Sequence, residues 1–387
     1  MPRWDWLIKP QIPYDRRFVC NVVLKAAVLF CGVNVLYALL DPLAWLSTLS
    51  LYNTMFPGRE RLPYADNPTE SYNLSLSQLE ALFASHVISA EAKPEEEYRV
   101  LILGDSATWG YLLEEDETFS ACLNRETHLT ADGRRLKAYN LGYPITNVTK
   151  DALILDYAVD YEPDAIVWFM TLEGMYNDDQ LNHPIIRTNS ERVRSLIERY
   201  GLSLDADLLP HAPGFLARTI IGQRRELADL IRHQFYGFIW TSTHIDHVNP
   251  RFFKSPMENF PPSVGVPNRA YLETGELSDY LAMDVLGAGV ALATEQGIPI
   301  LVVNEPIFIS TGLNSDLRYN ELYPRWIYDA YRTRLGELAV HENWRYVDLW
   351  DFVPAEHFTD FPLHYDAEWT CKVADVLLPQ ILAMAGD

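Results

Sequence analysis

Cysteine is scarce in this 387-residue sequence, and none of its four cysteines forms a Cys-x-x-Cys pair. The spacing therefore contains no zinc or redox motif. Basic residues are also few, because 31 lysines and arginines stand against 53 acidic residues, giving a formal net charge of −22. A chain with this charge repels a phosphate backbone, so we expect no nucleic-acid partner. The sequence also lacks internal repeats and low-complexity tracts, which argues against a repeat architecture.

One long apolar run is present near the N-terminus, FVCNVVLKAAVLFCGVNVLYALL at residues 18–40. As a helix, this run is long enough to span a hydrocarbon core about 30 Å thick. Four basic residues precede it and, apart from Lys25 within it, the next basic residue is Arg59. The positive-inside rule then places residues 1–17 in the cytoplasm and the rest of the chain outside. No small-x-small cleavage site follows, so we expect an uncleaved membrane anchor; the alternative is a buried core helix.

The remainder of the chain divides into a connecting region, residues 41–97, and one large domain, residues 98–387. Within the domain, short apolar runs alternate with helical patterns, which predicts a parallel sheet with right-handed crossovers. In such a sheet the site lies at the carboxyl ends of the strands. Five short apolar runs are predicted to be strands, and most are nearly all hydrophobic, as expected of strands buried on both faces: residues 99–104, 137–143, 164–171, 298–305 and 345–351.

The gap between the third and fourth apolar runs is too long for a single crossover. We therefore predict that residues 175–280 are largely an insertion. Within it, residues 214–240 fit a long helix. Its apolar face would comprise Phe215, Ile220, Leu227, Leu230, Ile231, Phe235 and Phe238. Two interpretations of this helix are open: it packs on the core, or it forms a lid or a membrane-facing surface.

A serine follows the first apolar run directly, where VLILG leads into Asp105 and Ser106. A residue just past a buried parallel strand lies at the reactive edge of the sheet. If a helix begins there, its free N–H groups point into the same space.

Four blocks of the sequence resemble those of the SGNH/GDSL hydrolases, in the same order. VLILGDSATWGY resembles the first block, YNLGYP (139–144) the second, and PDAIVWFMTLE (163–173) the third. DFPLH (360–364), followed by a closing helix at 374–382, resembles the last. The resemblance covers about residues 98–387. It implies an α/β fold, a three-layer flavodoxin-like sandwich with a five-stranded parallel sheet, and ester chemistry through an acyl-serine intermediate.

The resemblance also implies roles for individual residues. It makes Ser106 the nucleophile and His364 its base, since the closing helix follows His364. The residues alone leave His357 equally open, because both histidines follow the last strand with an acidic residue nearby. Asp360 would orient the imidazole and stabilise its charged form. The N–H groups of Ser106 and Gly142 would stabilise the developing oxyanion.

Two blocks depart from the family pattern. The last block usually places its aspartate three residues before the histidine, whereas Asp360 lies four residues before His364. The third block usually carries Gly-x-Asn-Asp, whose asparagine is an oxyanion donor. Residues 171–174 here read Thr-Leu-Glu-Gly, and Asn177 is the nearest asparagine that could substitute.

Glu173 occupies the place of the missing asparagine, and its ionised carboxylate would repel an oxyanion in a dry pocket. We therefore expect Glu173 to bind the loop backbone, to be held protonated, or to pair with Arg187 or Arg318. The predicted pocket comprises polar residues at or after the strand ends: Asp105, Asn140, Thr171, Glu173, Asn177, Asn304 and Glu305.

Two cysteines of the domain, Cys122 and Cys371, fall in or next to predicted helices. In a flavodoxin-like order these helices pack on the same face of the sheet. An oxidising compartment would permit a disulfide between them, and two buried free thiols are the alternative.

These observations favour an extracytoplasmic esterase or O-acyl(acetyl)transferase, anchored by residues 18–40. Its substrate would be an acyl ester on a polysaccharide, because an exported, tethered enzyme meets surface glycans. No cofactor and no metal are implied. Two alternatives remain: a lipid esterase, and a non-catalytic SGNH-fold scaffold or binding protein. The second is suggested by the absence of the asparagine that donates to the oxyanion in the family pattern.

Overall fold

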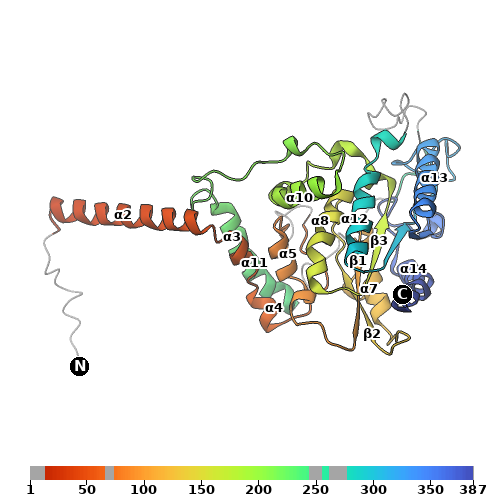
Figure 1. The fold of residues 1–387 in the computed structure, drawn as a ribbon, viewed down its shortest axis with the longest axis horizontal. Coiled ribbons are helices and arrows are strands. Elements are labelled where there is room, and N and C mark those ends of the chain that lie inside the picture. Colours follow the sequence, from red (N-terminus) through yellow and green to blue (C-terminus); the bar gives the residue numbers. More distant parts are fainter. Residues whose placement is uncertain (1–13, 66–73, 244–254, 261–276, 387) are drawn as a thin grey trace.

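The computed structural model describes residues 14–65, 74–243, 255–260 and 277–386. Most of the predicted cytoplasmic segment and part of the predicted insertion lie outside these residues. Figure 1 shows an α/β body from which a single long helix, α2, projects. The helices after α2 are α3 (Leu43–Ser47), α4 (Leu51–Met55), α5 (Leu79–Ala84), α6 (Ser106–Trp109), α7 (Phe119–Asn124), α8 (Val148–Ala158), α9 (Pro184–Thr188), α10 (Ser190–Tyr200), α11 (Arg224–Thr243), α12 (Met283–Glu295), α13 (Arg325–His341) and α14 (Ala367–Ala383).

Five parallel strands form one sheet in the order β2–β1–β3–β4–β5, so all five predicted strands are confirmed. The chain runs outward from β1 to β2, then returns to place β3 on the other side of β1. In this topology the ligand site lies at the carboxyl ends of β1 and β3, where the strand order reverses. The strands are β1 (Glu97–Leu103), β2 (Arg135–Asn140), β3 (Ala165–Met170), β4 (Ile300–Asn304) and β5 (Arg345–Asp348).

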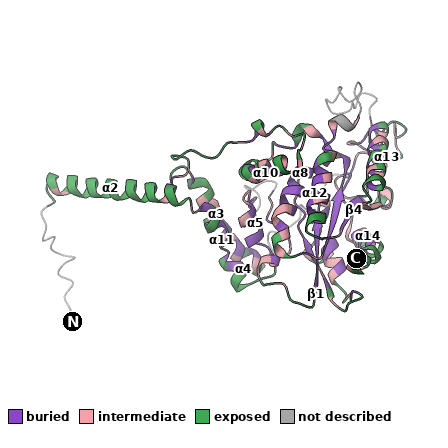
Figure 2. Ribbon diagram, in the orientation of Figure 1, coloured by how far each residue is buried: buried purple, intermediate pink, exposed green. Residues whose placement is uncertain are grey.

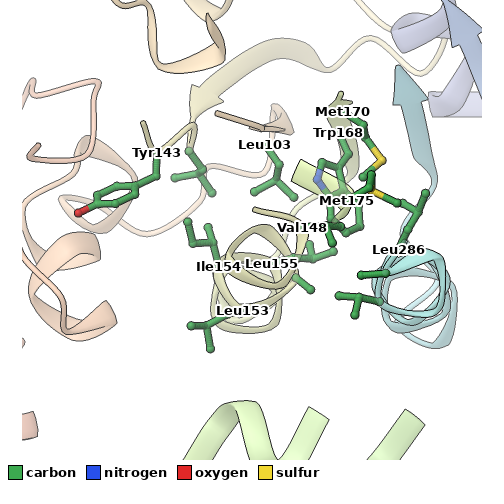
Figure 3. Close-up of a cluster of buried hydrophobic side chains, with 14 of the residues drawn as sticks. Leu103, Tyr143, Val148, Leu153, Ile154, Leu155, Trp168, Met170, Met175 and Leu286 are labelled. Atoms are coloured by element: carbon green, nitrogen blue, oxygen red, sulfur yellow. The ribbon is translucent and has the colours of Figure 1, made fainter. Parts of the chain in front are cut away.

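Helices cover both faces of the sheet, which gives the predicted three-layer sandwich. Side chains of β1 alternate between the faces: Leu101 and Leu103 pack toward α8 and α12, whereas Val100 and Ile102 pack toward α7 and α14. Figure 3 shows the first of these layers, with Trp168 of β3 between the sheet and α12. Because both faces are buried, the central strands β3 and β4 read as nearly continuous apolar runs rather than alternating ones. The edge strands β2 and β5 also contain charged residues.

A disulfide joins Cys122 of α7 to Cys371 of α14, with their Cα atoms 5.2 Å apart. The prediction that these two helices share one face of the sheet is thus confirmed. Of the two alternatives for this pair, the structure contains the disulfide rather than two free thiols.

Helix α2 (Arg16–Leu40) is long and apolar enough to cross a membrane, and it is exposed along nearly all of its length (Figure 2). Its first turn is capped by Asp15, whose side chain accepts a hydrogen bond from the N–H of Phe18. The alternative of a buried core helix is therefore wrong. Only Asn34 and Ala38, near its C-terminal end, are buried.

The long helix of the insertion begins ten residues later than predicted, at Arg224. Residues 214–223 instead form turns. A tertiary contact helps to fix them, because the N–H of Ile221 donates to the side chain of Asn34. Gly222 is also required there, since a Cβ at this position would lie 2.3 Å from the carbonyl oxygen of Ala217. Sequence periodicity cannot detect either constraint.

The predicted apolar face of this helix packs on the core only in part, through the half-buried Leu230. Phe215, Ile231 and Phe235 are exposed, whereas His233, Gly237 and Trp240 form the buried side of the helix. The core-packing interpretation is therefore wrong for these apolar side chains.

Candidate active site

Ser106 is the first residue of α6 and follows β1 by two residues. Gly104 permits the turn between them, because a Cβ there would lie 2.2 Å from the Thr108 hydroxyl oxygen. The carboxylate of Asp105 caps α6 by accepting a hydrogen bond from the Ala107 N–H at 2.8 Å. Ser106 is consequently half-buried at the carboxyl edge of the sheet, and its N–H, at the first helical position, has no intrahelical acceptor.

His364 connects Ser106 to an aspartate. Its Nε2 lies 2.7 Å from the Ser106 Oγ, and its Nδ1 lies 2.8 Å from Asp360 Oδ1. An ionised carboxylate can only accept a hydrogen bond, so Nδ1 carries the imidazole proton and Nε2 accepts from the serine hydroxyl. The imidazole is 6% exposed, which shields this arrangement from bulk water.

A tight hairpin explains how Asp360 reaches the imidazole from four residues away. The N–H of Thr359 donates to the His364 carbonyl at 2.8 Å, and the N–H of His364 donates to the Phe361 carbonyl at 3.1 Å. The hydroxyl of Thr359 also donates to Asp360 Oδ1. The unusual spacing is therefore accommodated by the turn.

The second candidate histidine, His357, pairs with a different carboxylate. Its Nδ1 pairs with Asp366 Oδ2 at 2.7 Å, and its ring lies 5.2 Å from that of Trp369. Asp366 also caps α14, so His357 belongs to the start of that helix. An aromatic residue that the sequence analysis did not select, Tyr111, instead lies against His364, with ring centroids 4.9 Å apart.

Gly142 lies against the backbone of α6. A Cβ at this position would lie 2.5 Å from the Trp109 backbone nitrogen, so only glycine permits the contact. The N–H of Gly142 donates to Asn140 Oδ1 at 3.0 Å, and the Asn140 amide donates to the carbonyls of Thr108 and Trp109. Asn140 thus fastens α6 to the end of β2, and the Gly142 N–H already has an intramolecular acceptor.

Two other predicted pocket residues are engaged within the fold. The hydroxyl of Thr171 is hydrogen-bonded to that of Tyr323 at 2.6 Å. Asn304 donates to Asp348 Oδ1 at 2.8 Å, which links the ends of β4 and β5. Asn177 is half-buried in a 3₁₀ turn, Asn177–Asp179.

Glu173 is half-buried in a 3₁₀ turn, Leu172–Met175. Its charge contributes, after burial, to raising the pKa of Tyr323 well above its usual value. The guanidinium of Arg187 donates to the backbone carbonyl of Leu208, and that of Arg318 donates to backbone carbonyls of the 320–321 turn. Which of the three expected arrangements Glu173 adopts stays a prediction.

A buried ammonium group, which the sequence analysis did not select, lies beneath the serine. Lys150 of α8 is fully buried, and its Nζ donates to the carbonyls of Gly104 at 2.8 Å and Tyr143 at 3.1 Å. It also pairs with Asp151 at 2.5 Å. Lys150 therefore ties the loop that carries Ser106 to the loop that follows β2.

Three buried carboxyl groups surround this single cation: Asp105, Asp151 and Glu305. Burial raises the pKa of Asp151 to about 6. Burial, and then the charge of Asp105, raise the pKa of Glu305 well above its usual value. Glu305 therefore shares the buried surroundings of Asp105, the residue that caps α6.

Among the described residues, no cluster of three or more His, Cys, Asp or Glu side chains is placed to hold a metal ion. Neither a protein-family model nor a curated protein matches the chain. Several solved structures are similar in fold. One is a lipolytic protein of the G-D-S-L family from Desulfitobacterium hafniense, with 11% identity, a TM-score of 0.36, and coverage of 73% of this chain and 99% of that chain.

Two further solved structures have similar scores. A GDSL-like lipase from Bacteroides thetaiotaomicron is 10% identical, with a TM-score of 0.37, over 77% of this chain and 94% of that chain. A carbohydrate acetylesterase family member from Sinorhizobium meliloti is 16% identical, with a TM-score of 0.33, over 75% of this chain and 99% of that chain.

Proposed function

We propose that this chain is a serine hydrolase or acyltransferase of the SGNH/GDSL type, which acts on acyl esters through an acyl-Ser106 intermediate. One observation carries the proposal: an unbroken line of hydrogen bonds runs from Ser106 through His364 to Asp360 at the carboxyl edge of the sheet. A serine hydroxyl is a weak nucleophile until a base removes its proton, and this geometry supplies both the base and the group that orients it.

The chemistry follows from the positions of the atoms. The Ser106 Oγ attacks the ester carbonyl carbon while its proton passes to His364 Nε2, and the carbonyl electron pair moves onto oxygen. Collapse of the tetrahedral intermediate breaks the ester bond, and the imidazolium returns the proton to the leaving alcohol. Water or a second alcohol then attacks the acyl-serine by the reverse route, giving hydrolysis or transfer. Asp360 stabilises the imidazolium in each half-reaction.

Stabilisation of the oxyanion distinguishes this site from the usual family pattern. The Ser106 N–H, at the start of α6, is available to the oxyanion. The Gly142 N–H would serve only by sharing or leaving its bond to Asn140. Loss of one donor typically costs about 10²–10³ in rate. We therefore expect slow hydrolysis of simple esters, which suits a transferase that should not pass its acyl group to water.

Three variants test the proposal. Ser106→Ala and His364→Ala should each abolish ester turnover and leave the thermal unfolding of the protein intact, and the double variant should be little worse than either. His357→Ala is the matched control, because it removes a histidine from the same hairpin without touching Ser106. A fluorophosphonate probe should label the wild type and His357→Ala at Ser106. Folded wild-type protein that resists labelling would favour the non-catalytic scaffold instead.

We further propose that the enzyme works outside the cytoplasm on an acylated polysaccharide. Two features support this location: α2 is suited to anchoring the chain, and the disulfide between Cys122 and Cys371 is typical of an oxidising compartment. The glycan is proposed because it is the ester-bearing polymer that a tethered, exported enzyme meets.

Location and substrate can be tested separately. Protease added to intact cells or spheroplasts should digest the domain after residue 40, and protection until lysis would contradict the orientation. A panel of p-nitrophenyl esters of increasing acyl length should give the highest kcat/KM for the acetyl ester, followed by release or transfer of acetate on an O-acetylated polysaccharide. A preference for long acyl chains would favour a lipid esterase.

A further inference from the structure

Exposed apolar side chains are unevenly distributed over the body of the protein. Outside α2, most of the large exposed ones come from two short segments, residues 45–56 and 215–239. We call them the apolar collar. Its six most exposed members are Trp45 (65%), Leu51 (61%), Met55 (63%), Leu216 (79%), Ile231 (59%) and Phe235 (67%). A concentration of this kind marks a surface that is covered by something else.

The two segments of the apolar collar form one surface. The side chain of Gln234 in α11 accepts from the Leu51 N–H at 2.8 Å and donates to the Leu49 carbonyl at 2.9 Å. The rings of Phe56 and Phe238 lie edge to face, 6.2 Å apart. Figure 1 shows α3, α4 and α11 together on the side of the body from which α2 projects.

The apolar collar is also continuous with the end of α2. The Asn34 side chain accepts from the Ile221 N–H at 3.4 Å, and Gln223 donates to Asp41. Helix α3 begins at Leu43, three residues after α2 ends, so no flexible linker separates body and helix. Asn34 lies six residues before the end of α2, or about 9 Å along its axis. The apolar collar therefore contacts the side of α2 within its last two turns, rather than only its C-terminal end.

We propose that the apolar collar rests in the outer leaflet of the bilayer, at the level of the headgroups and the first acyl carbons. The proposal rests on the assignment of α2 as a membrane anchor. If residues 18–40 span the bilayer, Asn34 lies near the outer end of the span. The loop that contacts Asn34, with its exposed Leu216, then lies at the outer side of the membrane. Trp45 belongs to the residue type that is enriched at this depth. The protein then holds its domain flat on the membrane, as interfacial helices do, instead of displaying it on a stalk.

Site-directed spin labelling of the full chain in lipid nanodiscs tests this placement. With Cys20→Ser, the native Cys31 of α2 serves as the lipid reference. Additional Cys31→Ser variants carry single cysteines at Leu216 or Phe235, and at Val340, an 84% exposed position in α13, as the matched control. Collisions with oxygen should exceed those with a water-soluble nickel complex several-fold at Cys31, Leu216 and Phe235, and the order should reverse at Val340.

The possible results distinguish failure of the apolar-collar proposal from failure of the assignment of α2 as a membrane anchor. Water-like accessibility at Leu216 and Phe235, with lipid-like accessibility at Cys31, would overturn the proposal and leave the anchor standing. Water-like accessibility at all three positions would remove both. Dipolar broadening at Leu216 that disappears on dilution with unlabelled protein would show that a second copy covers the collar, which would also overturn the proposal.

Discussion

Replacing Lys150 with methionine should destabilise the protein and impair the site together. Its ammonium group is fully buried, pairs with Asp151 at 2.5 Å and holds the carbonyls of Gly104 and Tyr143. Methionine fills a similar volume but leaves Asp151 without its cation. Breaking a buried ion pair by removing one partner typically costs about 3–5 kcal/mol. Spread over roughly 290 residues at ~2.1 cal/mol/K of unfolding entropy each, this lowers Tm by about 5–8 °C.

Activity should fall as well, because the carbonyl of Gly104 lies two residues before Ser106. A displacement of the nucleophile by about 1 Å can cost on the order of 10²-fold in rate. Differential scanning calorimetry and kcat/KM for a p-nitrophenyl ester measure the two effects. Lys372→Met is the matched control, since its ammonium pairs with Glu368 on the exposed surface of α14 and surface pairs contribute little.

A second substitution tests whether the unpaired carboxylate of Asp151 causes this loss of stability. In Lys150→Met/Asp151→Asn the carboxylate that pairs with Lys150 is neutralised as well, so the double variant should recover at least about 1 kcal/mol of the loss. Lys150 lowers the pKa of Asp151 in the wild type, where burial raises it to about 6, so the pKa of Asp151 in the single variant should lie above 6. The deficit of the single variant should therefore shrink as the pH falls toward 6, because a protonated Asp151 no longer needs a cation. A double variant as unstable as Lys150→Met, with a deficit independent of pH, would refute the reasoning.

Three other predictions concern glycine, the disulfide and buried histidines. In Gly142→Ala, the new methyl would lie 2.5 Å from the Trp109 nitrogen, so we expect a loss of about 1–3 kcal/mol and slower labelling of the serine by a fluorophosphonate; unchanged labelling would contradict the close packing. Cys122→Ser opens a cross-link of sequence separation 249 and should cost up to about 5 kcal/mol; dithiothreitol should lower the Tm of the wild type but not of this variant. Burial lowers the pKa of His86 to about 4 and that of His233 to about 3. Their contribution to stability is complete above pH 6.5 and is lost as the pH falls toward 4, because the unfolded chain takes up the protons first. His233→Gln should therefore reduce the fall in urea midpoint between pH 7 and pH 5. An unaltered fall would show that burial of His233 is not a source of the pH dependence of stability.

The sequence by itself determined the sheet and the position of the serine. Central strands buried on both faces are apolar at nearly every position, so the runs of β3 and β4 were visible without knowledge of their neighbours. Ser106 follows the first of the five apolar runs directly, and in a parallel sheet that places it at the reactive edge. The long exposed helix α2 was equally visible, because its composition alone distinguishes it from a strand or a turn.

Tertiary structure decided the features that depend on residues far apart in the chain. The choice between His357 and His364 required the hairpin that turns one imidazole toward Ser106 and the other toward Asp366. The start of α11 depended on contacts between residues 214–223 and α2, which outweigh local helix propensity. The cluster around Lys150 joins carboxyl groups from the β1–α6 turn, α8 and the end of β4, and no local pattern marks such a set. Burial and mutual charge, which raise the pKa of Glu305 well above its usual value, arise only when the folded chain excludes water from all of these groups at once.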